Sequence, residues 1–165
     1  MGNCAKLTGK PAILAILAAA LVAAPASAGA SDSMTLRAVV TRGCNVNALP
    51  MMFGTIAWFL PDANTQTSIL VDCTPNTAFT VAIDNGENYN GQRRMARIGA
   101  GLGNFLDYEI YRNAARTQRW GNTAGQTVGG TTPANGRVTL TAYGRATGFI
   151  VSGPFQDTVT VTITF

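Results

Sequence analysis

The chain has 165 residues, with 12 lysines and arginines against 8 acidic residues and a formal net charge of +4. This modest surplus is far from the dense basic surface of a nucleic-acid-binding domain, so we expect no nucleic-acid partner. The sequence contains no histidine, which removes the usual general base at neutral pH and the commonest metal ligand.

The first 28 residues have the three parts of an export signal. Lys6 and Lys10 supply positive charge, Pro11 to Ala24 form an apolar stretch, and Ala26-Ser27-Ala28 is a small-residue cleavage site. A membrane-spanning helix is the alternative, but the apolar stretch is shorter than the ~20 residues that a span needs. Cleavage would remove 28 of 165 residues, leaving 137 in one domain with a formal charge of +2. We therefore expect an exported protein with no stable membrane anchor after signal cleavage.

The rest of the chain is a series of short alternating or β-branched segments separated by turn residues. Asn85-Gly86, Asn90-Gly91 and Asn135-Gly136 are turn signals, because both residue types tolerate positive φ. Eighteen glycines and no sustained 3.6-residue apolar period in these segments argue against helices. The pattern predicts an all-β fold, an antiparallel β-sandwich. The expected strands are Met34–Thr41, Met51–Ala57, Gln66–Cys73, Phe79–Asp84, Leu106–Arg112, Arg137–Tyr143 and Asp157–Phe165.

Two of these segments lie at opposite ends of the expected mature chain. Residues 33–42 and 157–165 both alternate apolar and polar side chains, which places the apolar ones of each strand on one face. A strand at each end of the expected mature chain suits a subunit that donates one strand to a neighbouring subunit and is itself missing a strand. The pattern therefore favours assembly over catalysis.

Signal cleavage would remove Cys4 and leave a single pair of cysteines, Cys44 and Cys73. In an exported chain such a pair is most simply a disulfide. Closing a loop of about 30 residues would contribute roughly 3–4 kcal/mol in the chain-entropy model. Two free thiols are the alternative. A zinc site is disfavoured because no histidine and no third cysteine would remain.

No catalytic constellation is recognisable in the sequence. Asp107 and Glu109 share a strand face, but glycosidase carboxylates usually flank a cleft from different elements. No P-loop, G-x-S-x-G or Cys/His pattern is present. We expect neither an enzyme activity, nor a metal, nor a cofactor.

Arginines and aromatic residues are the remaining candidates for binding. We expect the arginines to be edge and loop cations that keep a β-protein soluble; contact with an acidic partner or an anionic polysaccharide is the alternative. We expect the aromatic residues in the core or in cross-strand pairs, with stacking on sugars as the alternative. The residues concerned are Arg93, Arg94, Arg97, Arg112, Arg116, Arg119, Tyr108, Tyr111 and Trp120.

Several short segments, each weak alone, form an ordered set along the expected domain. They are Arg42-Gly-Cys-Asn-Val46, Phe53-Gly-Thr55, Val71-Asp-Cys-Thr74, Arg93-Arg-Met95, Leu106-Asp-Tyr-Glu-Ile-Tyr111, Trp120-Gly121, Tyr143-Gly-Arg145 and Asp157-Thr-Val-Thr-Val-Thr-Ile-Thr-Phe165. With this set the chain resembles the spore coat protein U family, which includes the subunits of archaic chaperone–usher pili. Phe155-Gln156 departs from the pattern, because such sequences often carry Tyr shortly before the Asp. We expect the lost hydroxyl to alter a corner hydrogen bond and leave the role unchanged.

The resemblance implies an incomplete immunoglobulin-like β-sandwich that lacks its last strand. A periplasmic chaperone would fill the groove first, and the N-terminal strand of another subunit would replace it at an outer-membrane usher. The domains would be a signal peptide at 1–28, a tether and donor strand at 29–42, and a β-sandwich at 43–165. Pairing of residues 34–41 within their own sheet is the alternative. The inward-facing donor residues would be Met34, Leu36, Ala38 and Val40, and the groove would be bordered by Val159, Val161, Ile163 and Phe165.

These expectations lead to one hypothesis and one runner-up. The first is a structural subunit of a surface fibre, exported through the periplasm to the cell surface and used in adhesion or biofilm formation. The runner-up is a secreted coat or carbohydrate-binding protein that does not polymerise. A mobile N-terminal donor strand is needed only for the first.

Overall fold

The computed structural model describes residues 32–57, 59, 62–99, 103–148 and 151–165. Residues 39–165 form one compact unit, and the nine strands of the described residues all lie in it. The signal peptide expected at 1–28 falls outside the described residues. The strands are β1 (Cys44–Ala48), β2 (Asp62–Cys73), β3 (Ala78–Ile83), β4 (Arg93–Arg97), β5 (Phe105–Tyr111), β6 (Val128–Thr131), β7 (Arg137–Thr147), β8 (Phe155–Gln156) and β9 (Val161–Thr164).

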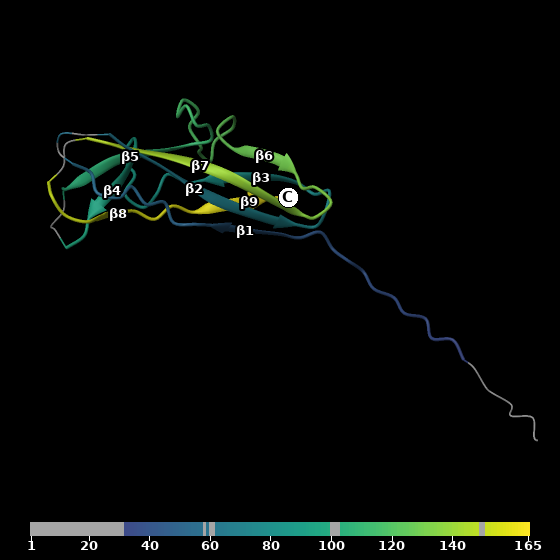
Figure 1. Ribbon diagram of the computed structural model, residues 1–165. Coiled ribbons are helices and arrows are strands. Elements are labelled where there is room, and N and C mark those ends of the chain that lie inside the picture. The colour runs from purple at the N-terminus through teal and green to yellow at the C-terminus, as the bar shows by residue number, and fades with distance from the viewer. Residues whose placement is uncertain (1–31, 58, 60–61, 100–102, 149–150) are drawn as a thin grey trace, which may run out of the picture. The chain divides into compact units, whose positions relative to one another are not determined.

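The strands form two antiparallel sheets that pack as a sandwich (Figure 1). The larger sheet has six strands in the order β1-β2-β7-β5-β4-β8, and the smaller has three in the order β6-β3-β9. The longest ladder of the larger sheet joins β2 to β7, from Asp62 opposite Thr147 to Asp72 opposite Arg137. The fold class expected from the sequence, an all-β antiparallel immunoglobulin-like sandwich, is confirmed.

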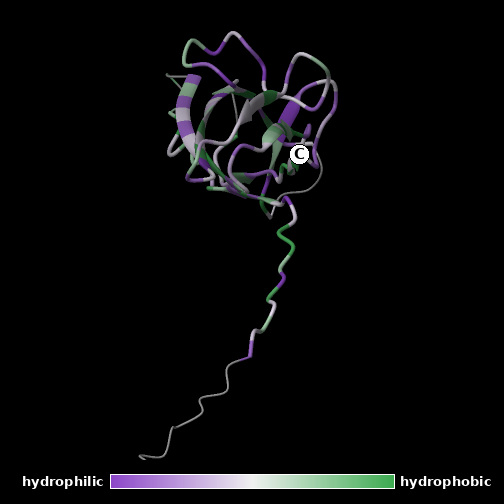
Figure 2. Cartoon of the chain, turned by 90° about the vertical axis from the view of Figure 1, so that its right-hand side faces the viewer, coloured by the Kyte–Doolittle hydropathy of each residue, from purple (hydrophilic) through white to green (hydrophobic). Residues whose placement is uncertain are grey.

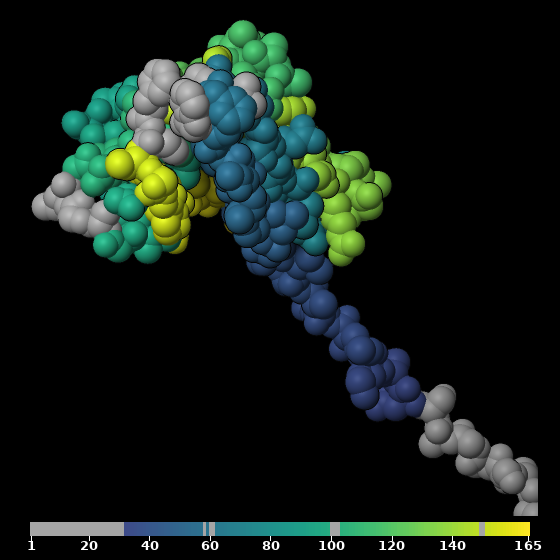
Figure 3. All heavy atoms as spheres, turned by 60° about the vertical axis from the view of Figure 1, so that its left-hand side comes forward, coloured from purple at the N-terminus to yellow at the C-terminus, as the bar shows by residue number. Residues whose placement is uncertain are grey.

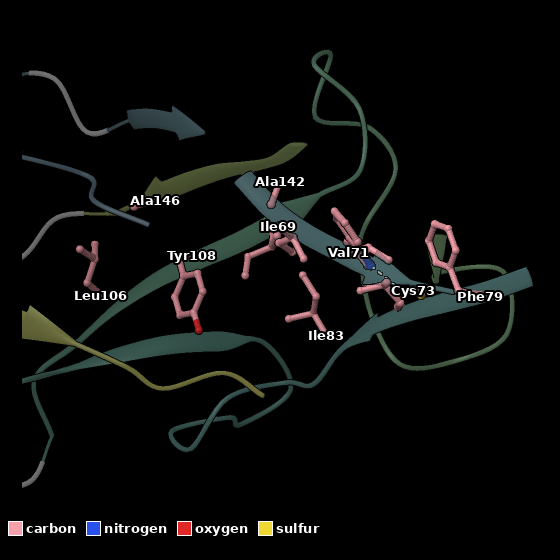
Figure 4. Close-up of a cluster of buried hydrophobic side chains, with 12 residues drawn as sticks. Ile69, Val71, Cys73, Phe79, Ile83, Leu106, Tyr108, Ala142 and Ala146 are labelled. Carbon is pink, nitrogen blue, oxygen red and sulfur yellow. Dashed lines mark hydrogen bonds between the residues drawn. The ribbon is translucent and has the colours of Figure 1, made fainter. Parts of the chain in front are cut away.

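The core lies between the two sheets and follows from the period-two pattern of their strands. On β5 every second side chain is buried, namely Leu106, Tyr108 and Ile110. On β3 the buried side chains include Val81 and Ile83, and Ile83 lies in the same buried cluster as Tyr108 of the other sheet (Figure 4). Each such side chain contributes about 1.5–3 kcal/mol when it leaves water. The remaining buried apolar residues are Ile69, Val71, Cys73, Phe79, Trp120, Ala142 and Ala146.

A disulfide joins Cys44 on β1 to Cys73 on β2, as the sequence predicts. The two cysteines face each other directly in the β1–β2 ladder, and their Cα atoms are 4.0 Å apart. This spacing is typical of a non-hydrogen-bonded antiparallel pair, where side chains come closest. The bridge therefore fastens the edge strand β1 to a central strand of the larger sheet.

All three Asn-Gly pairs lie in connections between strands, and the glycine of each has a positive φ. Gly136, just before β7, has a φ of 73°, and a Cβ there would collide with the carbonyl oxygen of Cys73. Gly86, with a φ of 83°, would carry its Cβ into the carboxylate of Asp157. Gly91 also has a positive φ, of 78°.

Two predicted strands, 34–41 and 51–57, are absent, and four observed strands were not predicted. A strand needs a neighbour to accept its hydrogen bonds, and residues 34–41 have none among the described residues. The strands missed are β1, β4, β6 and the two-residue β8.

No described helix is long and apolar enough to cross a membrane.

Candidate functional site

The last strand, β9, forms one open edge of the smaller sheet. It pairs with β3 on one side and has no strand on the other among the described residues. The carbonyl of Thr160 accepts a hydrogen bond from Asp84, so even-numbered residues present their backbone groups to β3. The backbone groups of Val159, Val161 and Ile163 consequently point to the open side.

The first strand, β1, forms a second open edge, on the larger sheet. The carbonyl of Gly43 accepts from Thr74 and the amide of Leu49 donates to Ser68, so odd-numbered residues bond to β2. The backbone groups of Cys44, Val46 and Ala48 therefore face away from β2. In the described part of the chain they meet no further strand.

The two open edges are neighbours along one seam of the sandwich (Figure 1). Some Cα atoms of β1 and β9 lie within 8 Å of each other. Two strands that admit a third between them must stand roughly 9.5 Å apart, twice the spacing of neighbouring strands. The seam is therefore a slot with hydrogen-bonding groups on both walls, and insertion of a strand requires the walls to separate.

The expected groove residues lie along this slot. Val159, Val161 and Ile163 are half-buried and pack against the core, while the intervening threonines are exposed. Phe165 is 58% exposed and lies beyond the end of β9. Three of the four groove residues thus offer apolar surface that the core covers only in part.

Next to β1 and β9, the segments that flank these strands line an apolar cavity of about 700 Å³. One wall is the segment 51–57, which follows β1, and the other is the segment 152–155, which precedes β9. Figure 3 shows this face hollowed between the blue surface of the first segment and the yellow surface of the second. Met95 and Leu106 close the cavity on the side of the larger sheet.

Segment 51–57 covers part of the larger sheet without forming a strand. Met51 and Phe53 lie directly over Gly144 of β7, where a Cβ would be 3.0 Å from the Phe53 ring. The Phe53 ring also meets Tyr108 edge-on, with centroids 6.2 Å apart. The three-stranded sheet is too short to cover this half of the larger sheet, and these side chains substitute for it.

The expected donor residues are fully accessible. Met34 and Leu36 are each 83% exposed and Val40 is 86% exposed, with Ala38 exposed as well. In Figure 2 apolar and polar colours alternate over residues 34–37, and an apolar stretch, residues 38–40, follows them. A large apolar side chain in water is unfavourable, so four in a row at period two call for a partner surface.

The six arginines singled out in the sequence are all buried or half-buried. This corrects the expectation that they are edge and loop cations that keep the protein soluble. Arg93 is fully buried and donates to the carbonyls of Ile83 and Asp84 and to Glu109. Arg119 lies 2.8 Å from the same Glu109 carboxylate. A buried guanidinium persists here because each of its three nitrogen atoms donates to an acceptor.

The side chains of Asp107 and Glu109 are both engaged with neighbouring polar side chains. Asp107 accepts a hydrogen bond from Gln92, and Glu109 is occupied by two arginines. No group of three or more metal-ligating side chains occurs within the described ranges. Tyr108 is an expected core aromatic, and burial together with its hydrogen bond to Asp157 raises its pKa.

Comparison with protein families matches residues 30–162 to the Spore Coat Protein U domain. The chain belongs to this family. The match spans the described sandwich almost to its end, so the resemblance seen in the sequence is confirmed. No curated protein matches this spore coat U chain.

Among solved structures, one match is the crystal structure of the CsuC–CsuE chaperone–tip adhesion subunit pre-assembly complex. That complex comes from the archaic chaperone–usher Csu pili of Acinetobacter baumannii. The sequences are 29% identical with a TM-score of 0.60, and the match covers 76% of this chain and 40% of that chain. The spore coat U chain thus spans less than half the length of the protein chain that it matches.

The sequence did not identify the cavity residues of the spore coat U domain. The sequence predicts an ordinary strand for Met51 and Phe53, and Phe155 stands out only as a departure from the family pattern. A conspicuous signal was available, because Met51-Met52-Phe53 is apolar at both faces of a supposed alternating strand.

Proposed function

We propose that this protein is a structural subunit of a secreted surface fibre of the chaperone–usher type. The N-terminal segment of one subunit fills the slot between β1 and β9 of another. The observation that carries the proposal is the pair of open strand edges facing one slot, with half-buried apolar side chains along it. Met34, Leu36, Ala38 and Val40 are the inward-facing residues of the donor segment.

The chemistry of this assembly is strand addition. The outward backbone groups of Val159, Val161 and Ile163 give hydrogen bonds to the incoming strand, and alternate side chains fix its register. A register slip by one residue would turn Arg37 inward, which places a charge among apolar groups at a cost of several kcal/mol. Period-two alternation in both segments therefore selects one alignment.

The partners follow from the same slot. A periplasmic chaperone occupies it before assembly, an outer-membrane usher is the place of exchange, and identical or related subunits supply the final strand. Membership of the spore coat U family and likeness to the chaperone–subunit complex support this. Export would use the signal at 1–28, with 29–42 as tether and donor strand before the domain at 43–165. The fibre at the cell surface would serve adhesion or biofilm formation.

A peptide-binding experiment tests the proposal on the exported chain. That chain carries Leu36→Arg so that its own segment cannot donate, and a peptide of residues 33–42 is added in trans. We expect the native peptide to raise the melting temperature by mass action. A Leu36→Arg peptide should fail, whereas a Thr35→Arg peptide, with the same charge on the outward face, should still bind.

The outcomes separate the two candidate functions. A stable monomer that ignores all three peptides contradicts strand donation and favours a secreted coat or carbohydrate-binding protein that does not polymerise. In cells, deletion of residues 33–41 should abolish incorporation into fibres. Undiminished incorporation of the deleted chain would also refute the proposal.

A further inference from the structure

The stretch just before β9, residues 157–160, lies outside the ladder but is fixed on one side by hydrogen bonds. The amides of Asp84 and Glu87 donate to the carbonyls of Thr160 and Thr158, at 3.0 and 3.1 Å. On its other side this stretch has no strand partner among the described residues. It therefore continues the open edge of β9 towards the cavity.

Asp157 begins this stretch and is held by three hydrogen bonds. Its Oδ1 accepts from the Asn88 side chain at 2.8 Å and from the Asn88 amide at 3.2 Å. Its Oδ2 accepts from the Tyr108 hydroxyl at 2.6 Å. Because Tyr108 belongs to β5, this bond ties the start of the open edge to the opposite sheet.

Asp84 provides a second carboxylate at the other end of the stretch. Its Oδ1 accepts from the amide of Thr160 at 2.9 Å and from that of Gly86 at 3.0 Å. Gly86 also sits against the first carboxylate, where any Cβ would displace Asp157. The Asn85-Gly86 turn is thus shaped to let both carboxylates reach the same stretch.

We propose that Asp84, Asn88, Tyr108 and Asp157 form an edge clamp, a set of positioning residues that holds 157–160 extended before a donor strand arrives. This inference rests on the proposed function, because it assumes that the open edge receives a strand. The clamp uses the backbone of Thr158 and Thr160 and the side chain of Asp157. It leaves the outward backbone groups of Val159 and Val161 free for the incoming strand.

The clamp matters because an unpaired strand end frays. A donor can bind only the extended conformation, and the apparent dissociation constant rises in inverse proportion to the fraction of molecules that have it. The clamp keeps this fraction high without covering the edge. Loss of one clamp bond should therefore weaken donor binding more than it disturbs the rest of the fold.

The test uses the exported chain with Leu36→Arg and the peptide of residues 33–42. Tyr108→Phe and Asn88→Ala each remove one side-chain hydrogen-bond donor to the Asp157 side chain. We expect each to weaken peptide binding by about tenfold, the usual size of a lost charge-assisted hydrogen bond. Hydrogen exchange at the Thr160 amide should be faster in both variants before peptide is added.

Thr132→Val is the matched control. Its hydroxyl accepts from the Thr77 amide at 3.0 Å and donates to the Thr74 carbonyl at 2.9 Å, beyond β6 on the opposite side of β3 from β9. We expect this variant to lower the melting temperature while leaving the peptide dissociation constant unchanged.

The results distinguish the clamp from the function on which it rests. If the clamp variants lose stability like the control but bind the peptide with an unchanged dissociation constant, the clamp inference is overturned and strand donation stands. If the chain with an intact clamp does not bind the native peptide, both fall.

Discussion

Replacement of Arg93 by Met is the sharpest test of what holds the two sheets together. Arg93 lies on β4 in the larger sheet, and its guanidinium reaches across to the end of β3 in the smaller one. It donates to the carbonyls of Ile83, at 3.0 Å, and Asp84, at 2.9 Å from Nε, and to the Glu109 carboxylate. Met keeps most of the side-chain volume and removes every donor.

The expected loss can be estimated from these contacts. Removal of one partner of a buried ion pair costs about 3–5 kcal/mol, since the other charge is left without compensation. Here Arg119 still neutralises Glu109 in part, which lowers that cost. The carbonyls of Ile83 and Asp84, however, lose a buried donor, at about 1–3 kcal/mol for each unsatisfied group. We expect a net loss of at least about 3 kcal/mol, a large share of the 5–15 kcal/mol typical of a domain.

Urea unfolding of the protein measures this loss, with Arg137→Gln as the matched control. Arg137 pairs with Asp72 at 3.2 Å, but its side chain is 76% exposed, so its removal should cost at most about 1 kcal/mol. Arg93→Lys should remain destabilising, because an ammonium cannot reproduce the planar fork of donors. If Arg93→Met and Arg137→Gln lie within 1 kcal/mol of each other, the buried guanidinium does not join the sheets as argued.

Three further predictions concern the disulfide, one carboxylate and one turn. Replacement of Cys44 and Cys73 by serine should lower the free energy of unfolding by roughly 3–4 kcal/mol and increase degradation in the periplasm; two free thiols by mass spectrometry of the native exported protein would contradict the bridge. Burial disfavours the ionised form of Asp84, but the donated hydrogen bonds of Thr160 and Gly86 outweigh it and lower its pKa below the ordinary 3.8. Ionised Asp84 thus stabilises the fold above about pH 4, and this contribution is lost as pH falls through the lowered pKa, so stability curves of wild type and Asp84→Asn should converge in acid. Gly136→Ala should cost at least about 1–2 kcal/mol in thermal unfolding, from the left-handed backbone conformation alone, and an unchanged melting temperature would show that the turn rearranges freely.

The strands that the sequence predicted correctly are those with one buried face. Phe79–Asp84 and Leu106–Arg112 match β3 and β5 within one residue at each end, because strict alternation reports a strand half in the core. β2 and β7 extend beyond their predicted bounds, since their outer ends alternate less clearly. Asp157–Phe165 was predicted as one strand, but only Val161–Thr164 is paired.

The strands that were missed have no such signal. β4, Arg-Arg-Met-Ala-Arg, buries its first arginine, which no hydropathy pattern anticipates. β8 has two residues and β6 contains two glycines, so neither offers a period to detect. β1 begins at the disulfide cysteine Cys44 and ends two residues before Pro50, and the asparagines that alternate with its inward side chains resemble a loop.

The candidate site was likewise only partly predictable from the sequence. Sequence alternation identified Val159, Val161 and Ile163 as one apolar face, and the structure places all three against the core along the slot. The second wall was not predicted, because it depends on the position of β1 at the edge of the other sheet. Nor could the sequence show that Tyr108, a core residue by pattern, would reach the Asp157 carboxylate.

The open edge has to accept a matching strand and yet avoid association with unrelated extended chains. An unpaired strand edge invites association with any extended chain, so proteins keep such edges short, polar or covered. Here β9 has four paired residues, and the threonines of β9 and of the stretch before it make the solvent face polar while favouring an extended backbone. Apolar side chains are confined to the face that packs on the core. A strand must therefore match this face at period two before it gains apolar burial as well as backbone hydrogen bonds, and random association gains only the latter.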